Sequence, residues 1–277
     1  MNTVFNDSRG RTWFDRLSGN TPLLPDYPAS VKVADAKIAG NPARLIAVVP
    51  DPDNPFPRAR NGEVGLLEGW QLARAVRELV AAERDRQHKS AIVAVIDVTS
   101  QAYGRREEAF GIHQALAAAA AAYADARLAD HPVIGLIVGK AISGGFLAHG
   151  YQANRLIAFD DAGVMVHAMG KQSAARITMR TVEALESLAA TVPPMAYDIV
   201  NYASLGLLWR TLKLANPDQP GSADVAMVSS ALEQAIADIL EDPERGLNSR
   251  LGAQNRMASA RVREALRRQW TETAHQR

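Results

Sequence analysis

The residue types best suited to chemistry in this chain lie together at Ser143, Gly144 and Gly145. The apolar run Val133 to Val138 precedes them and helix-compatible residues follow, which predicts a buried strand, a tight turn and a helix. A Gly-Gly pair lets the backbone approach a ligand with no Cβ in the way, and the first N–H groups of a helix lack partners within the helix. The pattern therefore predicts a backbone hole that binds an oxyanion, such as a thioester enolate or a tetrahedral intermediate.

A histidine follows on the next predicted strands. Residues 156–159 and 163–167 are mostly apolar, so each run predicts a strand, and His167 ends the second. An imidazole titrates near neutrality, which suits proton transfer, while a satisfied buried histidine is an equally good interpretation. Ser143 and His167 also suit a nucleophile and its base. No aspartate stands out as their third group, and the nearest candidate, Asp198, lies in a predicted helix.

The elements that must position these residues alternate between strands and helices. A hairpin followed by helix, strand, helix and strand predicts an α/β layered fold with crossover connections. The expected elements before residue 133 are strands at 31–38 and 43–49 joined by Gly40-Asn41-Pro42, a helix at 66–82, a strand at 91–98 and an alanine-rich helix at about 105–129.

The two ends of the chain differ from this core. Residues 1–30 carry three closely spaced prolines, which predicts a segment that wraps a surface or a partner without regular structure. We expect a core at 31–190 and, within the same domain, a helical C-terminal extension at 191–277. The helices expected toward the C-terminus cover 172–190, 196–214, 223–241 and 244–270.

Composition excludes several classes of function. The chain has 277 residues, 47% hydrophobic and 22% charged, with a formal net charge of +1 and no cysteine. The near-neutral net charge gives no electrostatic case for binding nucleic acid or an anionic membrane. The absence of cysteine rules out thiolate metal sites. His113, His131 and His149 lack metal-ligand spacing, so we expect no metal. The N-terminus lacks the apolar core of a signal peptide, and a cytoplasmic location is expected.

Two segments resemble the carboxyltransferase branch of the ClpP/crotonase superfamily. In that branch a strand leads into an Asp-Thr-Pro-Gly-Ala-Tyr-Pro-Gly type loop and an acidic helix start, and residues 95–104 with Glu107-Glu108 match it. Its second motif, a strand and a Ser-Gly-Gly-Ala turn, is matched by residues 137–146. The resemblance covers roughly residues 30–190. It implies an α/β, ClpP/crotonase-like β-β-α superhelix with a helical C-terminal extension.

Longer stretches are similar to the γ subunits of biotin-independent malonate decarboxylases. These stretches are RGRTWFDRLSG, VKVADAKIAGNPARLIAVVPD and SGGFLAHGYQANRLIAFDDAGVMVHAMGK. In that family the γ subunit pairs with a homologous β subunit. Together they convert malonyl, carried as a thioester on an acyl carrier protein subunit, into acetyl thioester and CO₂. A separate transferase subunit exchanges acetyl for malonyl on the carrier.

The resemblance implies roles for particular residues. Backbone N–H groups near Gly144-Gly145 are expected to stabilise the enolate, or to hold the departing carboxyl group, together with those near Ala102-Tyr103. We expect no directly bound cofactor, because the substrate is carried on the prosthetic group of the carrier protein or on coenzyme A. Lys140 is a candidate contact to that group, with a plain surface charge as the alternative. The bland interpretations are close packing for the glycines and a core or rim aromatic for Tyr103.

Three other functions stay open at this point. A carboxyltransferase subunit of a biotin-dependent acyl-CoA carboxylase shares the motifs, but here Val98-Thr99-Ser100-Gln101 replaces the Thr-Pro-Gly core, which is compatible with loss of biotin. A ClpP-like serine hydrolase would use Ser143 and His167. A structural subunit would shape the β subunit and dock the carrier without chemistry. The arginines of the last predicted helix suit either a solvated face or docking of an acidic carrier protein.

Overall fold

The computed structural model describes residues 8–251 and 253–275 of the chain. Its described part is built on one sheet in the order β1-β2-β3-β4-β5-β7, with β6 paired to the far half of β4. The β1–β2 pair is antiparallel, and the other pairs are parallel. The strands are β1 (Val31–Ile38), β2 (Asn41–Val48), β3 (Ala91–Val98), β4 (Val133–Ile142), β5 (Arg155–Phe159), β6 (Met165–His167) and β7 (Arg210–Leu212).

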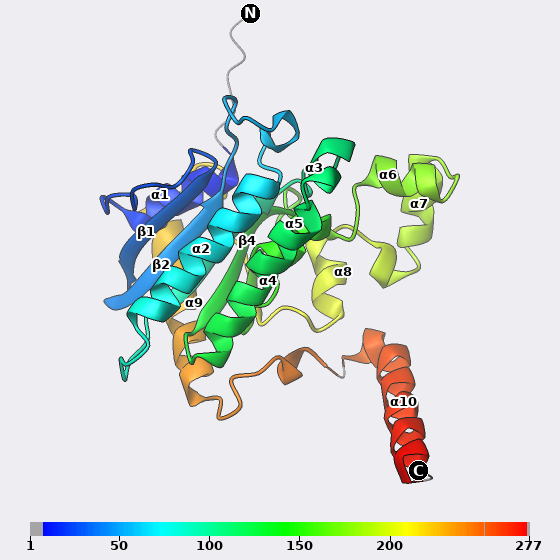
Figure 1. Cartoon of the computed structure of the whole chain (residues 1–277). Coiled ribbons are helices and arrows are strands. Elements are labelled where there is room, and N and C mark those ends of the chain that lie inside the picture. Colours follow the sequence, from blue (N-terminus) through cyan, green and yellow to red (C-terminus); the bar gives the residue numbers. More distant parts are fainter. Residues whose placement is uncertain (1–7, 252, 276–277) are drawn as a thin grey trace, which may run out of the picture.

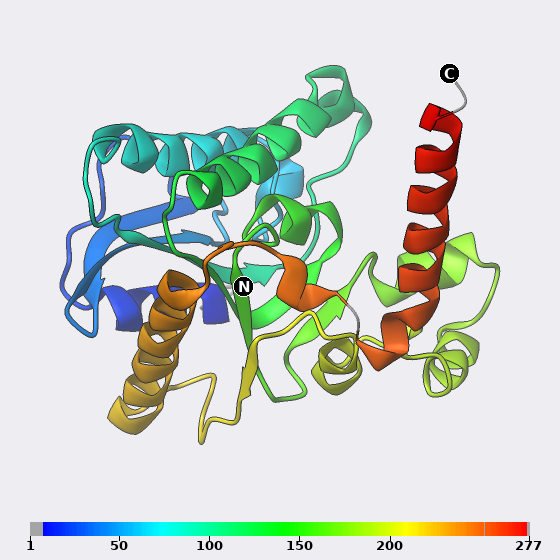
Figure 2. The same ribbon diagram turned by 90° about the horizontal axis from the view of Figure 1, so that it is seen from below.

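Helices cover both faces of the sheet, as Figures 1 and 2 show. Helices α2 and α4 pack against each other over one face, and α1 and α9 cover the other. No helix among the described residues is long and apolar enough to cross a membrane. The helices are α1 (Arg9–Ser18), α2 (Leu66–Ala82), α3 (Arg105–Ala109), α4 (Ile112–Leu128), α5 (Ser143–Ala148), α6 (Lys171–Ile177), α7 (Val182–Ala189), α8 (Ile199–Ser204), α9 (Ser222–Glu241) and α10 (Met257–His275).

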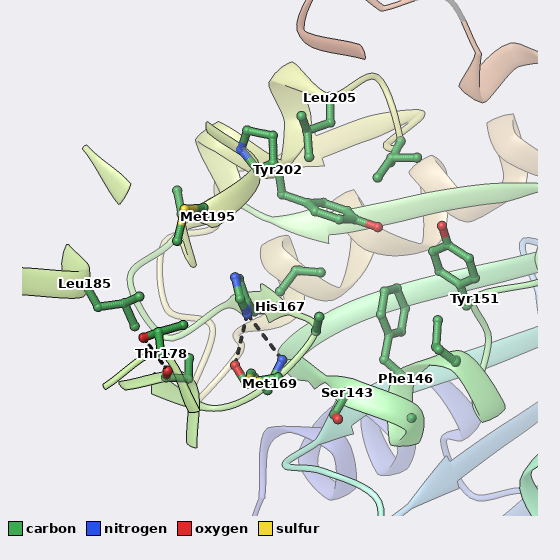
Figure 3. Close-up of a pocket in the computed structure, with 18 residues that line it drawn as sticks. Ser143, Phe146, Tyr151, His167, Met169, Thr178, Leu185, Met195, Tyr202 and Leu205 are labelled. Carbon is green, nitrogen blue, oxygen red and sulfur yellow. Dashed lines mark hydrogen bonds between the residues drawn. The ribbon is translucent and has the colours of Figure 1, made fainter. Parts of the chain in front are cut away.

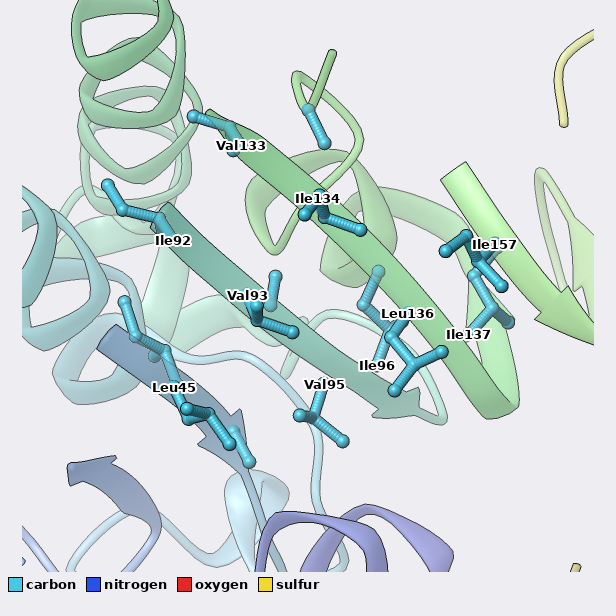
Figure 4. Packing of buried hydrophobic residues seen from close by; sticks show 14 of the residues in the cluster. Leu45, Ile92, Val93, Val95, Ile96, Val133, Ile134, Leu136, Ile137 and Ile157 are labelled. Carbon is cyan, nitrogen blue, oxygen red and sulfur yellow. The ribbon is translucent and has the colours of Figure 1, made fainter. Parts of the chain in front are cut away.

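The central strands are apolar on both faces because helices cover both sides of the parallel sheet. Ile92, Val93, Ile134 and Leu136 are fully buried in this core (Figure 4). The α/β prediction and the strand at 91–98 are therefore confirmed, as is the helix at 66–82. The long helix expected at 105–129 is broken by Gly111, whose φ of 81° lies in the left-handed region.

The predicted hairpin is present, but its turn lies one residue earlier. Ala39 and Gly40 both have positive φ, at 48° and 87°, and Ile38 pairs with Asn41. Two successive residues with positive φ form the tight turn whose twist matches that of the flanking strands. Asn41 and Pro42 consequently belong to β2, and pairing with β3 begins only at Ala43, beyond the proline.

The expectation of an irregular N-terminal segment is wrong for residues 9–18, which form α1. Ser8 caps this helix by accepting from the Arg11 amide. Trp13 is fully buried, packs edge-on against Phe159 at 4.7 Å and donates its indole N–H to Pro217 O at 2.9 Å. The proline-rich residues that follow hid a short amphipathic helix that belongs to the core.

The C-terminal part is less helical than predicted. The helix expected at 196–214 is wrong beyond Ser204, because β7 extends the sheet beside β5. A three-residue strand is too short to show a period of two. The helix expected at 172–190 is split into α6 and α7, whereas α9 confirms the helix at 223–241 and belongs to the core.

Residues 244–251 and 253–256 also differ from the predicted helix, which begins only at Met257. They contain two 3₁₀ turns, Asn248–Arg250 and Gln254–Arg256. Arg250 is buried and its guanidinium donates to the backbone oxygens of Tyr151 and Ala153. This contact ties the segment to the loop before β5. Beyond it, α10 projects from the body of the molecule (Figure 1).

His149 directly follows α5, and its side chain is fully buried. Its Nε2 lies 3.0 Å from Val95 O, an acceptor, so Nε2 carries the proton and Nδ1 accepts from the Tyr123 hydroxyl at 3.0 Å. Burial lowers the pKa of His149 to about 4, partly offset by the bond to Val95 O. The folded chain therefore keeps this imidazole neutral at pH values where an unfolded chain would bind a proton.

We predict that the free energy of unfolding falls as the pH is lowered from about 6.5 to about 4. In this window the unfolded chain protonates His149 and the folded chain does not, which removes about 3 kcal/mol in total. Urea unfolding across this range should show a shallower acid slope in His149→Gln than in the wild type. His113→Gln, at an exposed histidine, is the control. Equal slopes for wild type and His149→Gln would contradict the assignment.

Candidate functional site

The candidate site lies where β3, β4 and β6 end at one edge of the sheet. Ile142, the last residue of β4, pairs with His167, the last residue of β6. Ser143 then turns the chain into α5. Its φ of 61° is a left-handed backbone conformation that residues other than glycine rarely adopt. The predicted strand–turn–helix is confirmed, although β4 runs four residues beyond Val138 and the turn is compressed into Ser143.

A bulge in β4 sets the direction in which the end of this strand runs. The register between β3 and β4 shifts after Ile96, and Asp97 compensates by accepting the Lys140 amide at 3.0 Å. Its other carboxylate oxygen accepts the Gly10 amide of α1 at 3.1 Å. A Cβ on Gly139 would lie 2.6 Å from the Asp97 carboxyl carbon, so this position requires glycine. Beyond the bulge β4 leaves β5 and pairs with β6, which brings His167 beside Ser143.

Gly145 packs directly beneath the loop that follows β3. A Cβ at this position would collide with the Ser100 carbonyl oxygen and lie 2.7 Å from its carbon. The loop cannot move away freely, because Ser100 O accepts the Val64 amide at 3.0 Å. Close packing is therefore sufficient reason for glycine at 145, as in the bland interpretation of the pair.

Gly144 presents its amide to a side chain of the same loop. Its N–H donates to Gln101 Oε1 at 2.9 Å, so a carboxamide oxygen already occupies the expected oxyanion donor. The Gln101 backbone is fixed on both sides, since the Ala102 amide donates to Val64 O at 2.9 Å and Val64 in turn donates to Ser100 O. Only the Gln101 side chain is free to uncover the donor.

The other expected donors are engaged within the chain. The Ala102 amide is bonded to Val64 O, as above, and the Tyr103 amide donates to Gln101 O at 2.9 Å. The structure therefore gives neither amide to a ligand. The Tyr103 side chain is exposed, and its hydroxyl donates to the Glu108 carboxylate, which raises the pKa of Tyr103. It is thus a rim aromatic, in line with its bland interpretation.

A cavity of about 490 Å³ opens beside Ser143, Gly144 and His167 (Figure 3). Of the predicted site residues, the described wall contains these three but not Gly145, Ala102, Tyr103 or Lys140. Lys140 is exposed on β4. The rest of the wall comes from α5, from the loop before β5, and from the segment that runs from β6 to just beyond α8: Phe146, Leu147, Tyr151, Val166, Ala168, Met169, Ala174, Thr178, Leu185, Pro194, Met195, Ala196, Tyr202, Leu205 and Leu207.

His167 is held in place at this cavity. Its Nδ1 lies 3.0 Å from Met169 O and 3.2 Å from the Met169 amide, and its ring stacks on Tyr197 at 3.9 Å. Burial lowers the pKa of His167, against the opposing effect of the Met169 carbonyl. The imidazole is therefore mostly neutral near pH 7, and Nε2 points away from Met169 (Figure 3).

The geometry does not form a serine hydrolase triad. Within the described ranges no hydrogen bond joins Ser143 to His167. Asp198 instead caps α8, accepting the amide and the side-chain nitrogen of Asn201 at 2.9 and 2.8 Å. The same part of the chain holds no group of three or more His, Asp or Glu residues able to bind a metal.

Sequence reasoning missed three residues of this region. Gln101 appeared only as a departure from a glycine-containing motif, although a side chain at a glycine position is itself a signal that space is being filled. Asp97 is the one polar residue in the otherwise apolar strand 91–98, and such an exception indicates a buried hydrogen-bond network. Tyr202 carried no local signal, because its place depends on how α8 packs.

The fold and the site define a chain of the carboxyltransferase type with a crotonase fold. The model of the malonate decarboxylase gamma subunit family matches residues 59–270, and the chain belongs to this family. The fold class and family expected from the sequence are thus confirmed, with the corrections to both ends given above.

Three relatives agree with this assignment. A chain of a Pseudomonas malonate decarboxylase hetero-tetramer in complex with coenzyme A is 66% identical, with a TM-score of 0.91, covering 95% of this chain and 100% of that one. A chain of a Pseudomonas MdcD–MdcE hetero-dimer is 63% identical, with a TM-score of 0.88 and coverage of 95% and 99%. The malonyl-S-ACP:biotin-protein carboxyltransferase MADD of Malonomonas rubra is 32% identical over 206 residues, covering 73% of this chain and 67% of the relative.

We predict that alanine at Gly145 lowers the free energy of unfolding, whereas alanine at Gly144 changes it little. Gly145→Ala forces the loop backbone away and should destabilise the chain by about 1–3 kcal/mol. Gly144→Ala meets only the end of the Gln101 side chain at 3.3 Å, so its free energy of unfolding should stay within about 1 kcal/mol of the wild type. Urea unfolding of both variants measures the difference, and equal losses would show that backbone packing does not distinguish the two positions.

Proposed function

We propose that this chain supplies one half of a malonyl-thioester decarboxylase, paired with a homologous β subunit. In this reaction the bond between the carboxyl carbon and the α-carbon breaks and CO₂ leaves. The electron pair passes to the thioester carbonyl oxygen, giving an enolate, and protonation of the α-carbon yields the acetyl thioester. The barrier falls if fixed donors meet the oxygen on which charge develops.

The observation that carries the proposal is the Gly144 amide. This amide already donates a hydrogen bond to the side-chain carboxamide oxygen of Gln101 at 2.9 Å. A thioester oxygen or a carboxylate oxygen of the substrate would replace the carboxamide oxygen on the same donor. This exchange trades one hydrogen bond for another, so uncovering the donor costs little.

His167 is the proposed proton source for the α-carbon. It lies on the wall of the same cavity as Gly144, and its Nδ1 contacts with Met169 fix the ring. Because burial keeps the ring mostly neutral, it does not form a strong ion pair with the malonyl carboxylate, which would hold the carboxyl group back. After CO₂ has left, Nε2 takes up a proton from water and passes it to the α-carbon, so the one proton that the reaction consumes comes from solvent and the ring returns to its neutral form.

Exposed apolar side chains beside the site support pairing with another subunit. Tyr103, Phe110 and Leu147 are more than half exposed, and Met179 of the turn after α6 is 94% exposed. Their elements follow one another along one side of the molecule (Figure 1). Exposed apolar residues gathered on one side are typical of an interface. The MdcD–MdcE hetero-dimer of the relative makes a β subunit the proposed partner.

Helix α10 offers a second surface, proposed here for the carrier protein. Val262, Leu266 and Trp270 form an exposed row, and Arg263 and Arg267 lie beside it on the helix. A narrow apolar row flanked by arginines fits an acidic helical partner. The relative named for malonyl-S-ACP makes a thioester on a carrier protein the proposed substrate. An acyl-carrier transferase is a further proposed partner, since the Pseudomonas malonate decarboxylase is a hetero-tetramer.

Carboxyl transfer to biotin is the second candidate, because MADD, at 32% identity, uses a biotin-protein. The stretch Val98-Thr99-Ser100-Gln101, which stands in place of the Thr-Pro-Gly core of biotin-dependent relatives, favours decarboxylation. A purely structural role predicts that the covered donor is irrelevant to activity.

Reconstitution tests the proposal directly. Mixed with its β-like subunit, the chain should release CO₂ from malonyl-S-pantetheine without biotin, and each subunit alone should be inactive because the site is shared. Release of CO₂ can be followed in a coupled assay with avidin present. Inhibition by avidin would favour the biotin-dependent candidate, and a stable but inactive complex would favour the structural one.

We predict that Gln101→Ala lowers the KM of this reaction about 2- to 10-fold with little change in kcat. The substrate oxygen would then bind the Gly144 amide without displacing an internal partner. Gln101→Glu should raise KM, because a carboxylate holds the amide more strongly and repels the malonyl carboxylate. Gln114→Ala, an exposed glutamine on α4, is the matched control. A fall in kcat at constant KM in Gln101→Ala would instead make Gln101 a donor in the transition state.

A further inference from the structure

Arg250 is a buried cation that meets no carboxylate among the described residues. It lies in the segment between α9 and α10 and is only 7% exposed. Its guanidinium donates to the backbone oxygens of Tyr151 and Ala153 and lies over the Tyr151 ring at 5.6 Å. Its Nε has no acceptor in the described part of the chain. Arginine is almost never fully buried without a charged partner, which indicates that a negative charge from outside the chain completes this one.

The neighbouring charges make this need greater. Burial lowers the pKa of Arg250, and repulsion by Arg127 and Arg155 acts in the same direction. Asp238 and Asp242 both form ion pairs with Arg155, so these carboxylates neutralise that arginine and leave the charge of Arg250 uncompensated. The surroundings of Arg250 therefore favour an anion.

A cavity of about 170 Å³ opens beside Arg250. Arg155, Ser249 and Trp209 also line it, and none of its described lining residues is Asp or Glu. Since a water molecule occupies about 30 Å³ in the liquid, the cavity has room for one small oxyanion together with a few waters. Of the described residues, this wall shares only Leu207 with the cavity beside Ser143, so the two are different pockets.

The donors on this wall define the class of ligand. The oxygens of a phosphate or carboxylate group accept several N–H bonds at once, and they match the planar fork of an arginine. Ser249 is exposed and brings a hydroxyl donor to the same wall. A neutral ligand would leave the charge of Arg250 uncompensated, and a cation would be repelled. The cavity therefore fits a small oxyanion.

We infer that this cavity binds a small oxyanion, held by the Arg250 guanidinium and the Ser249 hydroxyl. Through Tyr151 O and Ala153 O, Arg250 joins the segment before α10 to the loop before β5. An anion on Arg250 neutralises this junction and thereby stabilises the folded chain. The inference does not rest on the proposed function, because no residue of the anion site takes part in the proposed chemistry.

Thermal unfolding of the full chain tests the inference, with inorganic phosphate as the probe and sodium chloride keeping the ionic strength constant. Phosphate should raise the Tm saturably, by about 2–5 °C at about ten times its Kd. Acetate in place of phosphate shows whether a carboxylate group is sufficient. A saturable rise with either anion supports the site and identifies the group that it prefers, whereas no saturable rise with either would overturn the inference.

Variants on the cavity wall locate the effect. Ser249→Glu brings a carboxylate to the wall, so it should abolish the phosphate response. Ser187→Glu, the same change at an exposed serine of α7, is the matched control and should keep the full response. Arg250→Met should also lose the response, and Ser249→Glu decides the matter if that variant does not fold. Equal rises in the wild type and Ser249→Glu would be a general salt effect and would contradict the site.

Calorimetric titration measures the binding itself. Phosphate should bind the wild-type chain at one site, and the Ser187→Glu variant in the same way, whereas Ser249→Glu should show no binding. Binding of phosphate to Ser249→Glu with an unchanged Kd would place the anion elsewhere and overturn the inference.

Discussion

The Asp97 carboxylate is the constraint on which the site depends. It takes the Lys140 amide that the β4 bulge would leave unpaired and the Gly10 amide at the start of α1. A carboxylate near a helix N-terminus is also favoured by the helix dipole. One side chain thus joins the N-terminal helix to the central sheet and stabilises the bulge. The bulge in turn moves β4 from β5 to β6 and sets His167 beside the first turn of α5.

Next to this bulge, a side chain of the same molecule covers the Gly144 amide, the expected donor. The loop after β3 is fixed through Val64, and Gly145 allows that loop to lie directly on α5. At that separation the Gln101 carboxamide reaches the Gly144 amide. In the single chain the Gly144 amide is therefore already hydrogen-bonded to Gln101, and a ligand would have to displace that side chain rather than water. Such an arrangement suits a subunit whose site is completed only by assembly.

Much of the fold was predictable because its signals are local. The hairpin around Gly40, the helix at 66–82 and the strand at 91–98 each show their own period or turn chemistry. The errors lie where tertiary contacts override local pattern. Strand β7 is too short for a period to show, and the bonds of Arg250 to Tyr151 O and Ala153 O hold its segment against the loop before β5, where a helix was expected.

The sequence by itself determined the family and the α/β order, because these follow from motifs and apolar runs along the chain. It also singled out Ser143, Gly144 and His167 as candidate site residues, and the structure brings these three to one cavity wall. Only the tertiary structure decided which amides remain available. Residues Ala102 and Tyr103 lie in the expected loop, yet their amides are bonded elsewhere. A hydrogen bond depends on the position of its acceptor. The Tyr103 amide bonds within its own loop, to Gln101 O, whereas Val64 O reaches the Ala102 amide only after the chain has folded.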